Sequence, residues 1–595
     1  MLYLNIEVEK VHTNFVRYLQ TLNNANSSND NAIAESQFTN PFYEKIRVES
    51  NVGNYLVEKI KENPTFIFLT GHAGDGKTSL LHQVLRYFDA IKPGQTLKEE
   101  DLIDINCSDK KIYYIKDMSE LICEKQVESI KKGFENKANG GSSIIVSNTG
   151  TLIDALKNFF KGSRYTDNEI EMDILKLMDE NSFEEGIVGD QSILVINLAL
   201  LDNTEIVSQL IDKILQEELW EGAEKCNLGD SCPIYNNYQI LKSHQEKFKK
   251  MAISYYKWLA ENDKRLTIRQ ILSHLSFAIT GNAPCSNINL INKQRVLRQY
   301  HISNLFFGYI GTEKDKNAQK IKSIVEIQNL NLDEKRLPFD HDLFVKEDFS
   351  VLVPEIQSVS KETWTSHRKS ILSDDKNSLY NEKAMNARRA IRRMQILFSD
   401  TNEKQDDLLL SAMYSPIFPK YLSYINEDLR GRSKRQLKDM IFKALQVVIS
   451  GDSDDSLGGS VLYLPLKRSG LNNQNVYLLV GKVDYEDFEI VTEPEKNIIS
   501  NEPTYKMYLK FNRIDSKHLL TLPLLEYFYY IANGSLSTKL NPVLSHGINK
   551  LKSQLYSRYK YNDDEDMIKV LIKTLSGPRI IDIEVDRASN KLYFN

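Results

Sequence analysis

A glycine-rich loop, Gly71-His-Ala-Gly-Asp-Gly-Lys-Thr78, has the residue types and spacing that bind phosphate groups. It follows an apolar run at 66–69 and precedes a helical pattern over 79–88. Glycines let backbone N–H groups turn inward around a β-phosphate, Lys77 can reach the β and γ oxygens, and the Thr78 hydroxyl can ligate Mg²⁺. The loop therefore predicts a nucleotide site. The residues expected around the phosphates are Gly71, Gly74, Asp75, Gly76, Lys77, Thr78 and Ser79, although packing within the loop is the alternative role for Asp75 and for His72.

A second apolar run, at 112–115, is followed by Asp117, with Glu120 three residues further on. A phosphate site needs an acid that holds Mg²⁺ and a carboxylate that can polarise the attacking water. We expect Asp117 and Glu120 to take these two roles, with a surface or helix-capping role as the alternative. Asp104 competes for the magnesium role, but the apolar run before it is shorter.

A third apolar run, at 143–147, ends in Asn148, and a fourth, at 193–197, ends in Asn197. Open α/β sheets bind ligands at the carboxyl ends of their strands, so Asn148 could orient a water or contact a γ-phosphate. This arrangement resembles the first sensor of AAA+ ATPases. The alternative is that Asn148 caps the helix expected near Thr151, and Asn197 could likewise cap a helix or support the site.

Three arginines could neutralise charge on a transferred phosphoryl group. Arg269 opens a helical pattern in Lys264-Arg-Leu-Thr-Ile-Arg269 and resembles a second-sensor arginine, with Arg265 as the alternative and a solvated helix face as the simpler role. Arg164 is the one arginine between Thr149 and Leu200, the stretch where AAA+ proteins, which this chain resembles, usually place an arginine finger for a neighbouring subunit.

Two basic clusters could neutralise phosphates along a nucleic-acid backbone. Alternatively, such arginines are solvated or paired with nearby acids, such as Glu427 and Asp428 beside the second cluster. The residues concerned are Arg388, Arg389, Arg392 and Arg393 in the first cluster, and Arg432, Lys434 and Arg435 in the second.

The cysteine spacing and the absence of nuclease motifs argue against several classes of protein. Five cysteines in 595 residues form no disulfide framework, which favours a reducing compartment. Cys226 and Cys232 are spaced too widely for a usual zinc pair. We find no convincing nuclease motif, so DNA cleavage by this chain is not expected.

From 42 to 305, short apolar runs alternate with helical patterns, and these elements must position the residues named above. This alternation predicts a three-layer α/β domain. Beyond it we expect mainly helices and then, after the turn-rich linker beginning at Gly451, an α+β domain that ends in a hairpin. The expected parts are an N-terminal helix and linker (1–40), the nucleotide-binding core (41–235), a helical lid (236–310), a connector (311–375), a basic helical region (376–452) and a C-terminal domain (453–595).

Composition is that of an ordinary globular chain, 41% hydrophobic and 26% charged. The formal net charge of -5 gives no whole-chain attraction to nucleic acid or anionic lipid. No signal peptide and no apolar run of about 20 residues is recognisable, so we expect a cytoplasmic protein without a membrane anchor.

Taken together, the phosphate loop, Tyr113-Tyr-Ile-Lys-Asp117, Ile145-Val-Ser-Asn148-Thr-Gly, Thr267-Ile-Arg269 and Asn304-Leu-Phe-Phe-Gly resemble the DptF family of ATPases, and more broadly AAA+-like P-loop NTPases. That family works in bacterial phosphorothioation-dependent DNA restriction. The resemblance would cover most of the chain, although motifs beyond the loop are shared with other defence ATPases. It implies a P-loop fold, a subunit that acts with partner proteins against unmodified DNA, and the roles given above for Asp117, Asn148 and Arg269.

Three functions remain open at this point. The first is an ATPase subunit of a DNA restriction or antiphage complex, with ATP and Mg²⁺ as cofactors and with DNA, partner subunits or a homo-oligomer as partners. The second is a nucleotide-dependent switch that senses a signal and oligomerises, and the third is a scaffold with a structural nucleotide. ATP is favoured over GTP because 402–406 only partly resembles a guanine-reading motif.

Overall fold

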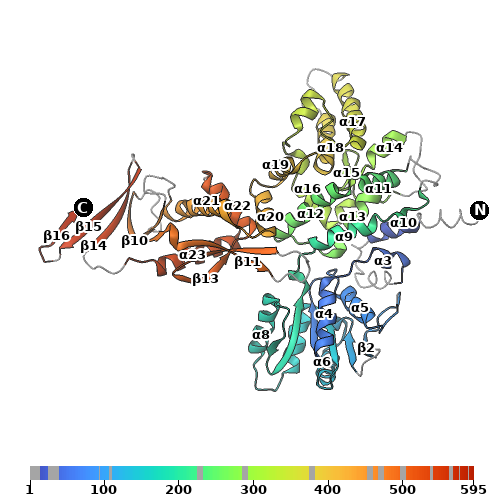
Figure 1. Ribbon diagram of the computed structural model, residues 1–595, viewed down its shortest axis with the longest axis horizontal. Helices are drawn as coiled ribbons and strands as arrows, with labels where there is room; N and C mark the ends of the chain where they lie inside the picture. Colours follow the sequence, from blue (N-terminus) through green and yellow to red (C-terminus); the bar gives the residue numbers. More distant parts are fainter. Residues whose placement is uncertain are drawn as a thin grey trace, which may run out of the picture. The chain divides into compact units, whose positions relative to one another are not determined.

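The computed structural model divides the chain into two compact units, the first ending at Met413 and the second beginning at Tyr414 (Figure 1). Each unit is described by itself. The residues described are 14–23, 39–92, 94–105, 110–223, 232–283, 293–373, 382–451, 460–466, 475–495, 504–535, 540–561, 567–574, 577–586 and 588–594.

The first unit contains a six-stranded sheet in the order β2-β3-β4-β1-β6-β5. The four inner strands run parallel, whereas the edge strands β2 and β5 are antiparallel to their neighbours. The four strands predicted from apolar runs are confirmed. The edge strand β5 was missed because it is short, and the shorter apolar run that ends at Asp104 proves to be the other edge strand, β2. The strands are β1 (Phe66–Thr70), β2 (Glu100–Asp104), β3 (Lys111–Ile115), β4 (Ser142–Val146), β5 (Gly186–Val188) and β6 (Gln191–Asn197).

Helices cover both faces of this sheet, because alternate residues of the inner strands enter two separate cores. In β1, Ile67 and Leu69 pack on one face, and Phe66 and Phe68 pack on the other. The α/β class expected from the sequence is therefore confirmed. The first face is covered by α4 (Asn51–Glu62) and α5 (Lys77–Tyr87), and the second by α6 (Cys123–Ala138), α7 (Thr149–Phe159) and α8 (Asp167–Glu180).

A helical part follows the sheet, as predicted for 236–310. Its core contains Trp220, which stacks on Tyr238 at 4.5 Å between ring centroids, and buried residues of α12 and α13. The helices are α9 (Thr204–Ile214), α10 (Glu217–Trp220), α11 (Pro233–Ser243), α12 (Gln245–Glu261), α13 (Ile268–Thr280), α14 (Lys293–Gln299) and α15 (Ile302–Leu305).

The stretch expected to be a connector is itself folded into the first unit. It holds the small β7 (Tyr309–Ile310) and β8 (Glu313–Lys314) pair and helix α16 (Lys322–Asn329). The long helices α17 (Pro354–Ser373) and α18 (Glu382–Phe398) pack side by side and are followed by α19 (Glu403–Met413). None of the helices in the described parts of the chain is long and apolar enough to cross a membrane.

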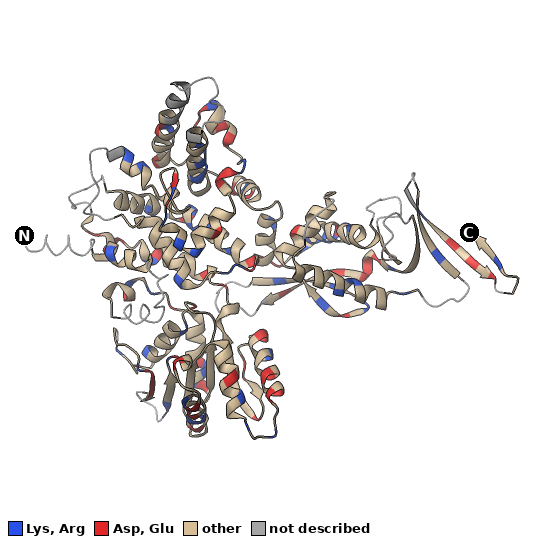
Figure 2. Ribbon diagram, turned by 180° about the vertical axis from the view of Figure 1, so that it is seen from behind, with Lys and Arg blue, Asp and Glu red and all other residues tan. Residues whose placement is uncertain are grey.

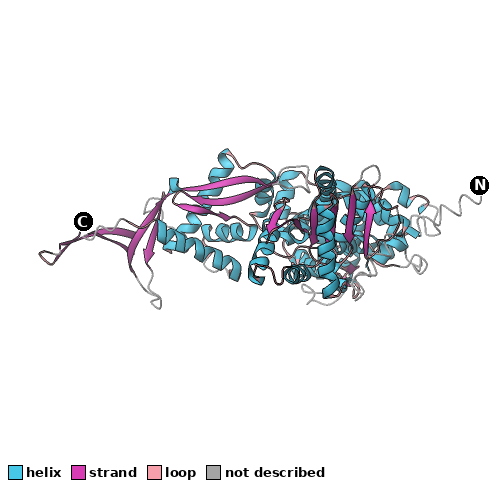
Figure 3. Cartoon of the chain, turned by 90° about the horizontal axis from the view of Figure 1, so that it is seen from below, coloured by secondary structure: helices cyan, strands magenta, loops and turns pink. Residues whose placement is uncertain are grey.

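The second unit combines two antiparallel sheets with helices (Figure 3). Its helix α21 packs on β9 and α22, with the Phe442 ring against Tyr485 and Phe488. The helical region expected over 376–452 is therefore divided, with α18 and α19 in the first unit and α21 in the second.

The terminal hairpin is confirmed as β15 paired with β16, whereas β14 was missed by the sequence analysis. The elements of the second unit are α20 (Phe418–Asn426), α21 (Gly431–Ser450), β9 (Val461–Leu466), β10 (Val476–Asp484), β11 (Phe488–Glu495), β12 (Thr504–Phe511), β13 (Ile514–Leu519), α22 (Leu522–Ala532), α23 (Pro542–Arg558), β14 (Met567–Thr574), β15 (Gly577–Asp586) and β16 (Lys591–Phe594).

Candidate functional site

The glycine-rich loop joins the end of β1 to the start of α5, in the centre of the sheet. Gly74 and Gly76 have φ values of +89° and +85°, in the left-handed region that side chains other than glycine rarely adopt. A Cβ atom on Gly74 would also lie 3.0 Å from the Thr267 hydroxyl oxygen. Backbone conformation and close packing therefore both explain the glycine spacing.

The Lys77 side chain is folded into the loop. Its amino group donates to the carbonyl oxygens of Gly71 at 2.7 Å and His72 at 3.2 Å, and to Asn148 Oδ1 at 3.2 Å. Burial lowers the pKa of Lys77, and this desolvation outweighs the attraction of the Asp117 and Asp75 carboxylates. A buried cation that is held mainly by carbonyl dipoles lacks a full compensating charge, which favours binding of an anion beside it.

A cavity of about 380 Å³ opens beside the Lys77 amino group. Its walls bring together residues from the loop, from the ends of β3 and β4, and from α13, although these lie far apart in the sequence. Of the candidates drawn from the sequence, the lining includes Gly74, Asp75, Gly76, Lys77, Thr78, Ser79, Asp117, Glu120, Asn148 and Arg269. Gly71 contributes its carbonyl oxygen to Lys77 instead.

Asp117 lines the cavity because β3 runs parallel to β4 and β1, so all three strands end at the same edge of the sheet. Its Oδ1 also accepts a hydrogen bond from the Ser119 backbone N–H at 2.9 Å and caps the short helix η1 (Met118–Glu120). Asp104 is excluded from this edge, because β2 runs antiparallel to β3 and carries Asp104 to the opposite end, where it lies 3.4 Å from Lys111.

The donors at this edge fit Mg²⁺, which prefers hard oxygen ligands and usually retains waters and substrate phosphates beside one or two protein groups. The Thr78 hydroxyl and the Asp117 carboxylate are such donors, and both line the cavity. In the part of the chain that is described, there is no cluster of three or more His, Cys, Asp or Glu residues suited to a metal held by protein ligands alone.

Asn148 occupies the N-cap position of α7, but its side chain makes no capping hydrogen bond. It accepts from Lys77 instead, so the side chain points toward the loop. Asn197 behaves differently, since its Oδ1 accepts from the Ala199 backbone N–H at 3.1 Å and caps the short helix η2 (Leu198–Leu200). Only the first of these two asparagines lies at the cavity.

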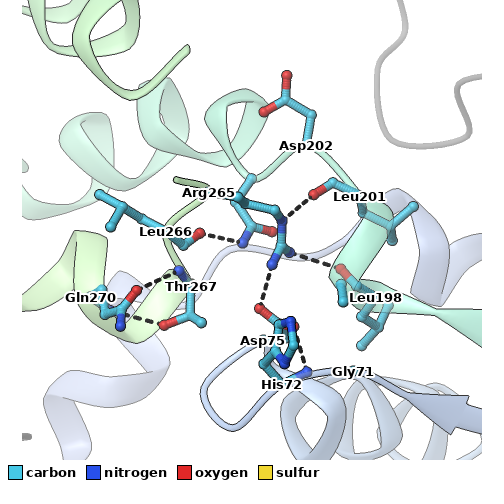
Figure 4. A network of polar contacts seen from close by, with 12 residues as sticks. Gly71, His72, Asp75, Leu198, Leu201, Asp202, Arg265, Leu266, Thr267 and Gln270 are labelled. Carbon is cyan, nitrogen blue, oxygen red and sulfur yellow. Dashed lines mark hydrogen bonds and ion pairs between the residues drawn. The ribbon is translucent and has the colours of Figure 1, made fainter. Parts of the chain in front are cut away.

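Arg265 joins the helical part to the loop through Asp75 (Figure 4). Its Nη1 lies 2.9 Å from Asp75 Oδ1, and it also donates to the carbonyl oxygens of Leu198 at 2.8 Å and Leu201 at 2.6 Å. Asp75 accepts a second hydrogen bond from the His72 backbone N–H at 2.8 Å. The Asp75 carboxylate is thus engaged in packing the loop, which was the alternative role considered for it.

Arg269 lies one turn from Arg265, at the start of α13, and its side chain lines the cavity. The Arg269 backbone N–H donates to the Gly74 carbonyl oxygen at 3.3 Å. Thr267 and Gln270 form a capping box that fixes where α13 begins. The first turn of α13 therefore packs directly on the glycine-rich loop.

Sequence reasoning missed a set of apolar and aromatic side chains that also line the cavity. Side chains reach it from the helical residues 14–23 and from α3 (Pro41–Ile46), α9 and α13. Such a lining suits a flat ring. No local pattern marks these positions, because they meet only through contacts across some 200 residues. They are Tyr18, Leu22, Tyr43, Ile46, Ile206, Leu210 and Leu272.

The first basic cluster, on α18, corrects one prediction (Figure 2). The Arg393 side chain is buried, with Nη1 2.6 Å from Asp333 Oδ2 and Nη2 3.0 Å from Asn304 Oδ1. It cannot present its charge to a nucleic-acid backbone. Arg392 and Arg389 are partly buried and lie 2.7 Å from Asp340 and 2.8 Å from Glu334.

Other predicted basic residues are exposed. Arg388 lies over the Phe344 and Trp364 rings, and Arg164 stacks on Tyr165 in the segment between α7 and α8. Neither of them lines the cavity. In the second unit, Arg432 and Arg435 are exposed in the first turns of α21, where Lys434 lies 3.6 Å from Glu489.

Cys232 is buried and precedes α11, whereas Cys226 lies outside the described residues. No protein-family model, curated protein or solved structure matches this chain significantly, so the geometry above carries the functional argument.

Proposed function

We propose that this chain binds ATP with Mg²⁺ in the cavity beside Lys77 and hydrolyses it. The observation that carries the proposal is the Lys77 amino group, which is buried in a glycine loop and adjoins a cavity lined by Thr78, Asp117 and Asn148. A cation, a hydroxyl, a carboxylate and an amide at one edge of a parallel sheet are the groups that phosphoryl transfer to water needs.

Each group has a distinct role in the proposal. Lys77 leaves the Gly71 and His72 carbonyl oxygens and binds the β- and γ-phosphate oxygens. Thr78 and Asp117 hold Mg²⁺, which supplies charge neutralisation when bound. Glu120 polarises the attacking water, Asn148 orients it, and Arg269 stabilises the charge on the γ-phosphate. The apolar and aromatic side chains of the lining take the base.

Nucleotide binding is coupled to the helical part in this proposal. Phosphate entering the loop displaces the Lys77 amino group, and the same loop is held by Arg265 through Asp75 and by the Arg269 N–H through Gly74. These two contacts also support the alternative function, a nucleotide-dependent switch that changes its assembly, because either activity needs the loop to move the helices.

We further propose, on the resemblance of its motifs to DptF, that the protein is a cytoplasmic ATPase subunit of a bacterial DNA restriction or antiphage complex. Cleavage is assigned to a partner. DNA would be contacted through Arg432, Lys434 and Arg435, and Arg164 would serve a neighbouring copy as an arginine finger.

The test is ATP hydrolysis by the wild type and by Lys77→Ala, with Mg²⁺ and with a chelator, in parallel with nucleotide binding. Lys77→Ala should lower turnover more than about 100-fold, because it removes the cation that stabilises the negative charge developing on the phosphoryl group. Lys161→Ala is the matched control, since Lys161 is exposed and does not line the cavity; it should turn over normally.

Added duplex DNA then separates the two functions. Turnover that rises with DNA and falls with salt supports the restriction subunit. Nucleotide retention without turnover, with assembly that depends on nucleotide and not on DNA, supports the switch. Failure of the wild type to bind nucleotide overturns both.

A further inference from the structure

The outer sheet of the second unit has one face made almost wholly of apolar side chains. Its strand order is β16-β15-β14-β10-β9, and all neighbours are antiparallel. Directly paired residues of an antiparallel sheet lie on the same face. One cross-strand row therefore contains Leu466, Leu478, Val570 and Ile581, and a neighbouring row contains Ile568, Ile583 and Phe594.

Two more cross-strand pairs extend this face. Leu592 lies opposite Val585 at one end, and Ile572 lies opposite Arg579 at the other. We call these rows and pairs the apolar face. Arg579 is its only charged member among the described residues and sits at its edge. The opposite rows are different: Lys569 pairs with Asp582 at 2.6 Å, and Glu584 lies opposite Tyr593. Most of the charged side chains of the outer three strands thus lie on one side, and the other side is apolar apart from Arg579.

Much of the apolar face is exposed. Five of its side chains are 51% (Leu466), 43% (Leu478), 38% (Ile568), 55% (Leu592) and 67% (Phe594) accessible, four more are half-buried, and Val570, inside the first row, is buried at 9%. By contrast Leu479 and Leu571, which point to the opposite side, are 3% and 1% accessible. An antiparallel sheet normally exposes its polar side and buries its apolar one, so an exposed apolar face marks an interaction surface.

Nearby segments outside the described residues do not have the composition to cover this face. The segments 452–459, 467–474, 562–566 and 575–576 contain three apolar side chains, Leu457, Leu471 and Leu575, and their other residues are glycine, polar or charged. A surface large enough to bury the apolar face must therefore be supplied by residues outside these segments.

The size and uniformity of the face point to a second copy of the same chain. The five most exposed residues offer roughly 500 Å², and four half-buried ones add to this, which approaches the about 800 Å² that each partner buries in a standard interface. The face has no charge pattern that would select a different charged partner. A two-fold axis would bring equivalent apolar rows together as a two-sheet sandwich, the usual way in which such faces are buried.

We propose that two copies of this protein dimerise through the apolar face of the β9, β10, β14, β15 and β16 sheet. The proposal does not depend on the nucleotide site. Because apolar contacts are not screened by ions, the dimer should persist or strengthen as salt rises, unlike an association held by charges.

The experiment measures the mass of the full-length protein by analytical ultracentrifugation, without nucleotide, from about 0.1 to 100 µM. We expect a dimer of twice the 68.6 kDa chain mass. Leu592→Lys with Phe594→Lys, both on β16, should raise the dimer dissociation constant at least about 100-fold. Leu466→Lys with Leu478→Lys, on β9 and β10, should have the same effect. This second double variant keeps the test valid if the first one fails to fold.

The matched control is Met567→Lys with Tyr593→Lys. These residues are 37% and 47% accessible and belong to the opposite rows, so two positive charges there should leave the dimer intact. A wild type that stays monomeric overturns the proposal and assigns the face to another occupant, either the first unit or a different protein. A dimer that survives both apolar-face variants, or that the control also dissociates, overturns it as well.

Discussion

Two arginine-rich helices that look alike in the sequence differ completely in the structure. On α18, three of the four arginines are paired with acids in the first unit, and one of them, Arg393, is buried between Asp333 and Asn304. On α21, Arg432 and Arg435 are exposed in the first turns of the helix. The same residue type is thus buried in ion pairs in one place and exposed in the other.

The difference arises from what lies opposite each helix. α18 packs against α15 and the 3₁₀ helix at Leu332–Glu334, which supply the Asn304 amide oxygen and the Asp333 carboxylate. Desolvation lowers the pKa of Arg393, so the guanidinium depends on these partners. The first turns of α21 have no comparable set of buried acids; Arg430, for example, meets only the Asp428 carboxylate at 2.6 Å and remains 84% exposed.

The largest effect should come from Arg393→Met. It leaves the nearly buried Asp333 carboxylate without its cation, which costs about 3–5 kcal/mol of unfolding free energy. Urea unfolding followed by tryptophan fluorescence reports on the first unit alone, because Trp220, Trp258 and Trp364 all lie there. Adding Asp333→Leu should recover part of the loss; a single variant as stable as the wild type would contradict the role of this pair.

A second effect should appear on acidification, at the same helix interface. Burial lowers the pKa of His301, which packs against Phe398 of α18, from 6.5 to about 4. The unfolded chain therefore binds a proton below about pH 6.5 and the folded chain does not until about pH 4, so stability falls over that window, by about 2 kcal/mol at pH 5.

His301→Asn should reduce this dependence in urea unfolding measured between pH 7 and 5, and Asn retains an acceptor for the Ser303 backbone N–H. Part of the dependence should remain, because burial also lowers the pKa values of His82 and His274 in the first unit to about 4. The exposed His546→Asn, in the second unit, is the control and should leave the slope unchanged. An unchanged slope in His301→Asn would mean that other groups carry the pH dependence.

The smallest effect should come from Arg432→Met with Arg435→Met. Because both side chains are exposed, unfolding of the second unit, followed by circular dichroism, should change by no more than about 0.5 kcal/mol. If this surface contacts a nucleic-acid backbone, the same variant should weaken DNA binding and reduce its salt dependence. A large loss of stability here would erase the distinction between the two helices.

Local sequence was a good guide where one strand or one turn decides the outcome. The buried strands β1, β3, β4 and β6 follow from their apolar runs, and the loop at Gly71–Thr78 follows from its glycines. Prediction from local sequence failed where the burial of a side chain depends on residues far away in the chain. Nothing near Tyr18 or Leu210 marks them as cavity residues, and Arg265 and Arg269 could not be told apart until α13 was placed on the loop.

Local patterns were enough to predict the α/β class and to single out Lys77, Thr78, Asp117 and Asn148, because each of these residues follows a short pattern that also defines its backbone. Long-range packing was needed to show that β3, β4 and β1 end side by side, that Asp104 faces away, that Arg393 is buried and that one face of the outer sheet is apolar and largely exposed. The physical reason is that strand order, register and burial are set by contacts between residues far apart in the chain, and no local pattern encodes them.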